Sequence, residues 1–196
     1  MHLFIELFTF GAFVAIFAHA ARTRGRSGVA LLSALFLLGL LRENAVAIRA
    51  LLYDFAPLTL NLGRAPLIAT IIWGFSIYAA LVFAEEVMGE AIGSRVSSPW
   101  TFGAVALFMV ALVGFYEPFL AEIGMARWQE GTCATLGVPW IALIGYPTLA
   151  VGFLLLWEWA ASRTIPLRLA ILALGLPVLA LGHAFGLQAL KAALDW

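Results

Sequence analysis

Long apolar runs are the feature that most constrains this chain, because they follow one another over almost all of its 196 residues. A helix needs about 20 apolar residues to cross a bilayer core of about 30 Å. Six runs reach or approach that length, and they cover residues 2–21, 28–53, 65–89, 99–124, 138–161 and 166–190. The pattern predicts an all-α polytopic membrane protein with about six transmembrane helices, forming a single transmembrane domain over residues 1–196.

The composition agrees with this prediction and excludes several classes of site. The chain is 64% hydrophobic and 11% charged, whereas charged residues make up about a quarter of a soluble domain. A net charge of zero argues against a nucleic-acid partner, which requires a basic surface. Cys133 is the only cysteine, which excludes an internal disulfide and a cysteine zinc site. His19 and His183 are offset in depth, so a bis-histidine haem is not expected either.

The basic residues predict an orientation in the membrane. Loops on one side carry six arginines: Arg22, Arg24, Arg26, Arg95, Arg163 and Arg168. The opposite side has three basic residues near its surface: Arg64, Arg127 and Lys191. Because cytoplasmic loops carry an excess of Lys and Arg, we expect the first set to be cytoplasmic and both termini to lie outside.

One stretch of the chain occurs twice. Two apolar runs joined by a polar loop appear around residues 42–75 and again around residues 116–146. The full copies extend over about 28–89 and 99–161. Each copy begins on an even-numbered run, so both pass through the bilayer in the same direction. This predicts a parallel repeat formed by helices two and three and by helices four and five, in contrast to the inverted repeats of many transporters.

The two copies keep their carboxylates in register. When Pro66 is aligned with Pro139, Glu43 falls opposite Glu117 to within one residue. The same alignment superimposes a second acidic pair, Glu85 and Glu158. A carboxylate at membrane depth costs at least a few kcal/mol and therefore usually faces a bundle interior or a wet cavity.

Glu43 and Glu117 should lie at comparable depth in the outer half of the membrane, and two interpretations of them stay open. In the first, the acids hold the bundle together through hydrogen bonds and salt bridges, with Arg42 or Arg49 pairing Glu43. In the second, they face each other across a pocket as a proton donor and its partner.

The loops between the paired runs carry aromatic and charged residues that could cover such a pocket. Arg127 and Asp54 are candidates to pair with the buried acids. Tyr53 and Trp128 fit either a lid or ordinary interface anchoring, because Trp and Tyr are common at both membrane surfaces. Motifs for serine hydrolases, zinc proteases, thiol redox enzymes and nucleotide binding are absent, so any catalysis must use carboxylates.

The loop-and-helix stretches resemble a known family. EPFLAEIGMARW followed by GVPWIALIGY resembles the carotenoid-biosynthesis integral membrane proteins of the bisanhydrobacterioruberin hydratase type. ENAVAIRALLYDF followed by LGRAPLIATIIWG is similar to that family's first acidic helix and to its proline-opened partner, which ends near Trp73. The likeness covers about residues 40–80 and 115–147.

The resemblance implies addition of water to the terminal double bond of an acyclic carotenoid. A carboxylic acid would protonate the alkene, and a second carboxylate would guide water to the resulting tertiary cation. Either Glu117 or Glu43 is the expected acid, and the other is the expected base or cation stabiliser, with Asp54 as a third catalytic candidate. The expected substrate-binding residues are Arg42, Tyr53, Trp73, Arg127, Trp128, Trp140 and Tyr146. Neither a metal nor a cofactor is required, and the expected location is a prokaryotic cytoplasmic membrane.

Two other classes of function stay open. An accessory or pigment-binding subunit of a larger membrane complex would use its aromatic surfaces to contact partner helices. A small transporter would need the outer acids and the inner pair, Glu85 and Glu158, to lie along one path.

Overall fold

The fold of the protein, obtained as a computed structural model, contains five long helices. The structure describes residues 2–49, 53–55, 60–92, 97–122, 124, 126–128, 134–135 and 138–194. The helices are α1 (His2–Arg49), α2 (Leu67–Met88), α3 (Pro99–Glu122), α4 (Trp140–Ala161) and α5 (Ile165–Ala193). All five are long and apolar enough to cross a membrane. The prediction of an all-α protein with long apolar helices that could cross a membrane is therefore confirmed.

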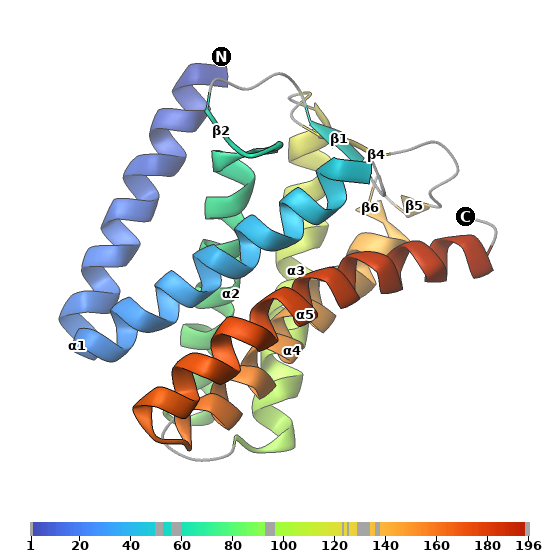
Figure 1. Cartoon of the computed structure of the whole chain (residues 1–196). Helices are drawn as coiled ribbons and strands as arrows, with labels where there is room; N and C mark the ends of the chain where they lie inside the picture. The colour runs from blue at the N-terminus through green and yellow to red at the C-terminus, as the bar shows by residue number, and fades with distance from the viewer. Residues whose placement is uncertain are drawn as a thin grey trace.

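The first predicted run and most of the second belong to one continuous element, α1, which covers residues 2–49. The backbone leaves helical geometry at Gly25, which has φ 55° and ψ −138°, and Figure 1 shows α1 as two arms that meet at a sharp bend. A positive φ favours glycine, which has no Cβ to clash. Gly28 is also required there, since a Cβ at this position would lie 2.4 Å from the Ala20 carbonyl oxygen. Two helical arms therefore meet at a kink at Gly25, within the break that the sequence predicted between the first two runs.

Prolines mark the starts of α2 and α4. Pro66 has φ −61° and ψ 137°, and Pro139 has φ −63° and ψ 134°, so each is an extended residue directly before its helix. Both helices then run for 22 residues. The fixed φ of proline suits the entry to a helix, and proline has no N–H that would need a partner there.

Short strands, which the sequence did not predict, occupy the loops. They are β1 (Tyr53–Phe55), β2 (Asn61–Leu62), β3 (Ala65–Pro66), β4 (Ala126–Trp128), β5 (Ala134–Thr135) and β6 (Val138–Pro139). They form three antiparallel pairs, β1 with β4, β2 with β3 and β5 with β6. The β1–β4 pair joins the two predicted repeat loops, and the pairs gather toward one end of the helices (Figure 1).

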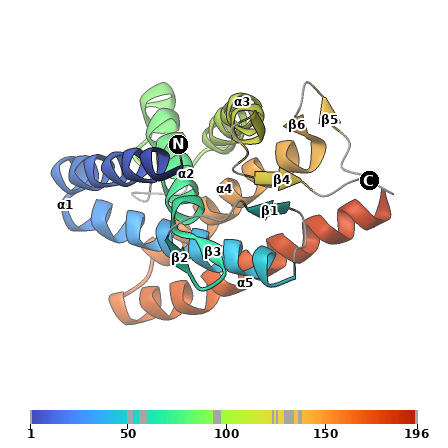
Figure 2. The same cartoon turned by 90° about the horizontal axis from the view of Figure 1, so that it is seen from above.

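The helices pack so that α2 and α4 lie in the interior. α1 contacts α2 and α5, while α3 contacts α2 and α4; Figure 2 shows α5 alongside the second arm of α1, with α3 on the other side of the bundle. The fully buried apolar side chains include Leu35, Leu38, Ile77, Leu81, Met109, Leu149 and Phe153. Lipid supplies no hydrophobic driving force between helices, so close packing must hold them together.

Gly39 allows α1 to lie close against α2. A Cβ at this position would lie 2.7 Å from the Thr70 carbonyl oxygen and 2.9 Å from Trp73 Cβ. We expect Gly39→Ala to destabilise the protein by about 1–3 kcal/mol because the helices must separate. The measurement is the free energy of unfolding in mixed detergent micelles. Gly103→Ala is the matched control, since nothing lies within 4 Å of its Cβ; equal stability of the two variants would contradict the prediction.

Candidate functional site

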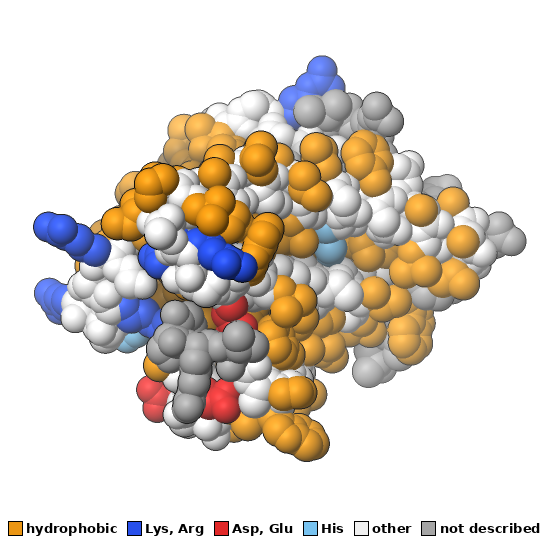
Figure 3. All heavy atoms as spheres, turned by 60° about the horizontal axis from the view of Figure 1, so that its bottom comes forward, with side chains coloured by type: hydrophobic (Ala, Val, Ile, Leu, Met, Phe, Trp, Pro, Cys, Tyr) orange, Lys and Arg blue, Asp and Glu red, His pale blue; other side chains and the backbone are white. Residues whose placement is uncertain are grey.

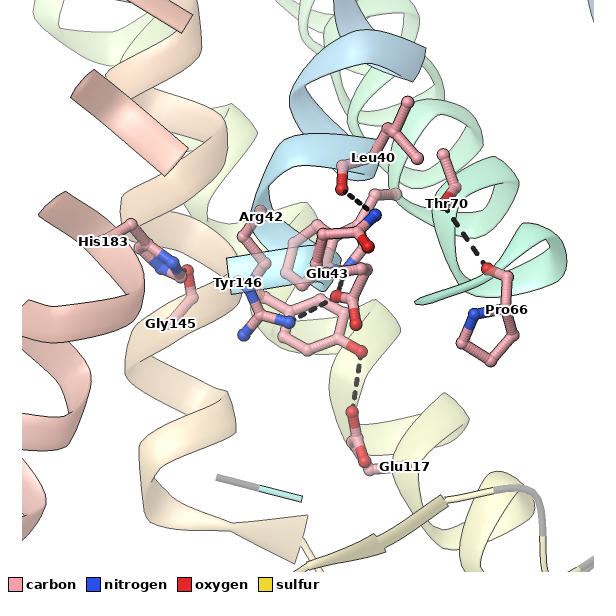
Figure 4. A network of polar contacts seen from close by, with 11 residues as sticks. Leu40, Arg42, Glu43, Pro66, Thr70, Glu117, Gly145, Tyr146 and His183 are labelled. Atoms are coloured by element: carbon pink, nitrogen blue, oxygen red, sulfur yellow. Dashed lines mark hydrogen bonds and ion pairs between the residues drawn. The ribbon is translucent and has the colours of Figure 1, made fainter. Parts of the chain in front are cut away.

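The first buried carboxylate, Glu43, lies on the second arm of α1 and has no exposed surface. Arg42, which is 2% exposed, forms an ion pair with it. Trp73 of α2 donates its indole N–H to the same carboxylate oxygen. The Arg42 guanidinium also lies 4.7 Å from the centre of the Trp73 ring, a cation–π distance. Arg42 and Trp73 therefore hold the Glu43 side chain and also contact each other; Figure 4 shows Arg42 beside Glu43.

The second buried carboxylate, Glu117, lies on α3 and is 4% exposed. The Tyr146 hydroxyl of α4 donates a hydrogen bond of 2.7 Å to one oxygen. The Trp128 indole N–H of β4 donates a hydrogen bond of 2.8 Å to the other. Glu117 is thus held by two neutral donors, one from a helix and one from a loop strand.

An aromatic contact joins the two carboxylates. The rings of Trp73 and Tyr146 lie 4.4 Å apart between centroids and are inclined by 32°, at the short limit of about 4.5 Å for favourable aromatic pairs. Figure 4 shows Tyr146 beside Arg42, with its hydroxyl directed at Glu117. Each stacked ring thus donates to a different acid. We refer to this group as the carboxylate cluster; its members are Arg42, Glu43, Trp73, Glu117, Trp128 and Tyr146.

The two aromatic donors hold corresponding places in the chain. Trp73 lies seven positions after Pro66, and Tyr146 lies seven positions after Pro139. Because both prolines directly precede 22-residue helices, the donors emerge at the same height on α2 and α4. This height is six residues into each helix, or about 9 Å from its start at 1.5 Å per residue.

The remaining predicted site residues are Trp140, Tyr53, Asp54 and Arg127. Trp140 begins α4 and is 45% exposed. Tyr53, Asp54 and Arg127 are placed by their backbones in the β1–β4 pair, where Asp54 lies opposite Arg127 and Tyr53 opposite Trp128. Their side chains, like that of Arg49, lie outside the part of the chain that the structure describes.

The second acidic pair lies far from the cluster. Glu85 forms an ion pair with Arg24 and accepts the Ile92 backbone N–H at 2.8 Å. Glu158 accepts the Ser97 backbone N–H at 3.1 Å and the Ser97 hydroxyl. Glu85 lies 12 positions after Trp73, and Glu158 lies 12 positions after Tyr146. This separation is about 18 Å along a helix. Both therefore tie a helix end to another segment of the chain.

Glu6, which was not among the residues predicted from the sequence, is also buried. It lies on the first arm of α1 and is 8% exposed. Its neighbour Ile5 packs against Ile68 of α2, close to Leu120 of α3. The sequence could have indicated Glu6, since it is the only acidic residue in the first apolar run.

His183 ties α5 to α4. Its Nε2 lies 2.8 Å from the Gly145 carbonyl oxygen, as Figure 4 shows, so this nitrogen must carry the proton that it donates. A nitrogen engaged in this way is not free to bind a ligand. Among the described residues, no group of three or more His, Cys, Asp or Glu side chains is placed to hold a metal ion.

No family model, curated protein or solved structure matches this chain. The chemistry open to the carboxylate cluster therefore has to be inferred from its geometry. Two carboxylates lie one to two turns inside the ends of their helices, at either end of a stacked aromatic pair. Such groups can donate a proton, accept one, and present π-faces to a positive charge.

Proposed function

We propose that the protein adds water to the terminal double bond of a long acyclic isoprenoid, of the carotenoid class, within the membrane. The observation that carries this proposal is the carboxylate cluster, in which Glu43 and Glu117 are each bound by one ring of the Trp73–Tyr146 stack. The sequence resemblance to carotenoid hydratases supports the same reaction. Long apolar substrates also suit a site that is enclosed by helices and surrounded by lipid.

Glu117 is the proton donor in this proposal. A general acid must give up its proton during the reaction, and the partners of Glu117 are the neutral donors Tyr146 and Trp128. A hydroxyl can accept as well as donate, so Tyr146 accommodates Glu117 in either protonation state. Proton transfer to the CH carbon of the terminal double bond breaks the π-bond and leaves a tertiary cation on the carbon that carries the two methyl groups.

Glu43 is the matching base, held in place by Arg42 and Trp73. Water adds its oxygen to the tertiary cation and loses a proton to Glu43. Return of that proton to Glu117 completes the cycle, so the net reaction consumes one water and leaves both carboxyl groups as they began. The faces of Trp73 and Tyr146 would stabilise the cation by cation–π attraction.

The proposed membrane arrangement has six crossings and a parallel repeat. The bend at Gly25 would let each arm of α1 cross separately. The two proline-opened helices of 22 residues and the corresponding places of Trp73 and Tyr146 support the repeat. The arginine distribution supports placing the carboxylate cluster toward the outer surface of a prokaryotic cytoplasmic membrane.

An accessory subunit of a larger complex is the second candidate. It is favoured by the first arm of α1, which exposes the large apolar side chains of Leu3, Phe4, Leu7 and Phe8. Partner helices that cover this arm would bury those side chains. In that case the carboxylate cluster would serve only to join α1, α2, α3 and α4, and no substrate would reach it.

Expression in a bacterium that accumulates lycopene tests the proposal. Pigments are extracted and analysed by mass spectrometry, and we expect a product heavier by one water. The matched control is the same strain with an empty vector. Unchanged lycopene in cells that contain the folded protein in their membranes would overturn the hydratase proposal, and co-purification of another membrane chain would then favour the accessory subunit.

A further inference from the structure

A polar pocket lies at the opposite end of α2 from the carboxylate cluster. Its volume is about 550 Å³, within the range of small-molecule sites. One wall comes from α1 near its bend, and the other from the C-terminal end of α2 and the residues that follow it. Figure 3 views the molecule from this side and shows basic and acidic side chains together, beside apolar flanks. The pocket therefore lies at one end of the helices, where charged side chains gather beside apolar ones.

One wall of the pocket is held by a local network. Arg24 pairs with Glu85, at side-chain exposures of 20% and 17%, and its guanidinium lies 5.6 Å from the centre of the Tyr78 ring. His19 Nδ1 lies 3.2 Å from the Tyr78 hydroxyl. The positive charge of Arg24 is thus balanced by Glu85 inside the wall.

The rest of the pocket carries excess negative charge. Glu90 lines it and accepts the Thr101 hydroxyl at 2.5 Å and the Ser98 backbone N–H at 3.1 Å. Glu86 also lines it, is exposed, and makes no hydrogen bond or ion pair within the described part of the chain. A cationic group that enters the pocket would therefore meet an available carboxylate.

Positive charge lies outside the pocket. Arg22 and Arg26 flank Arg24 in the chain, and both are exposed. Arg22 and Arg26 each lie two residues from Arg24, which lines the pocket, so a ligand with a cation at its inner end and an anion next to it would match this order of charges. Such a dipolar group at a membrane surface is a zwitterionic phospholipid headgroup, and Val82 on the pocket wall offers an apolar contact beside it.

We propose that this pocket binds the headgroup of a phospholipid with a primary ammonium, of the phosphoethanolamine class. The ammonium donates hydrogen bonds to Glu86, and the phosphate lies against Arg26 and Arg22. A carboxylate that accepts charged N–H donors forms a strong, short hydrogen bond, which a trimethylated choline headgroup is unable to reproduce. The pocket therefore selects the primary amine over the quaternary one.

Native mass spectrometry of the purified full chain, with phosphatidylethanolamine, phosphatidylcholine and phosphatidylglycerol of identical acyl chains, tests this site. We expect about tenfold tighter retention of the ethanolamine lipid than of the choline lipid, as one charge-assisted hydrogen bond provides. Glu86→Gln should bring the ethanolamine lipid down to the choline level. Glu122→Gln, an exposed acid at the far end of α3, is the matched control and should change nothing.

Three results would overturn the proposal. Equal retention of the ethanolamine and choline lipids would show that the amine is not recognised. Preferential retention of the glycerol lipid would show a simple anion site on the arginines. Unchanged retention in Glu86→Gln would place the lipid elsewhere. Because Glu86 is exposed, its substitution should leave the fold intact, which circular dichroism of the same sample checks.

Discussion

Glu117→Gln is expected to abolish water addition to lycopene in the carotenoid-producing strain. The substitution keeps the shape of the side chain and an oxygen that can accept from Tyr146, but it removes the proton that the alkene must receive. General acid catalysis contributes about 10²- to 10⁴-fold in rate, so we expect a loss of at least about 100-fold. The measurement is the ratio of hydrated to unreacted pigment by mass spectrometry.

Glu122→Gln serves as its control, because Glu122 is exposed and lies at the end of the same helix. Product formation in this variant should equal that of the unmodified protein. A hydrated product at the normal level in Glu117→Gln would remove Glu117 from the acid role. Loss of product in both variants, with both proteins in the membrane, would show that the assay does not report on the buried site.

Arg42→Leu is expected to cause the largest loss of stability. Arg42 and Glu43 are buried together as an ion pair, and removing one partner leaves an uncompensated charge inside the bundle. Breaking a buried pair in this way costs about 3–5 kcal/mol. The free energy of unfolding in mixed detergent micelles measures the loss, with the exposed Arg163→Leu as a control that should stay near the original value.

The double variant Arg42→Leu/Glu43→Gln distinguishes loss of charge balance from loss of packing. It removes both charges and keeps an oxygen that accepts the Trp73 N–H. Replacement of a whole buried pair by neutral groups is often close to neutral in stability, so the double variant should recover most of what Arg42→Leu loses. A double variant as unstable as the single one would mean that the Arg42 side chain contributes through its packing on Trp73.

The sequence was most informative about the helices. Unpaired backbone N–H and C=O groups are costly in lipid, so an apolar run long enough to cross the membrane has to form a helix. Pro66 and Pro139 marked two helix starts correctly. The break predicted around Arg22 to Gly28 coincides with the kink at Gly25, which separates the two helical arms of α1. Arginine is a good helix former, so charge alone does not end a helix, and within α1 only Gly25 leaves helical geometry.

The two acids of the candidate site were predictable from the sequence, whereas the aromatic residues that bind them were not. Carboxylates are costly in lipid, so Glu43 and Glu117 stand out in their apolar runs, and the duplicated register linked them. Their donors were harder to identify. Trp73, Trp128 and Tyr146 were named as aromatic candidates among many similar residues, but nothing in one sequence distinguishes a tryptophan that donates to a buried acid from an exposed one such as Trp140.

By itself, the sequence determined that this is a helical membrane protein and where most of its helices run. It also determined which acids carry the highest cost of burial. All three follow from the chemistry of single residues in lipid. The tertiary structure alone decided which side chains meet. The Trp73–Tyr146 stack depends on how α2 and α4 pack, and the Trp128 contact with Glu117 depends on a β4 strand paired across two loops. Such contacts join residues far apart in the chain, and helix packing in three dimensions sets them.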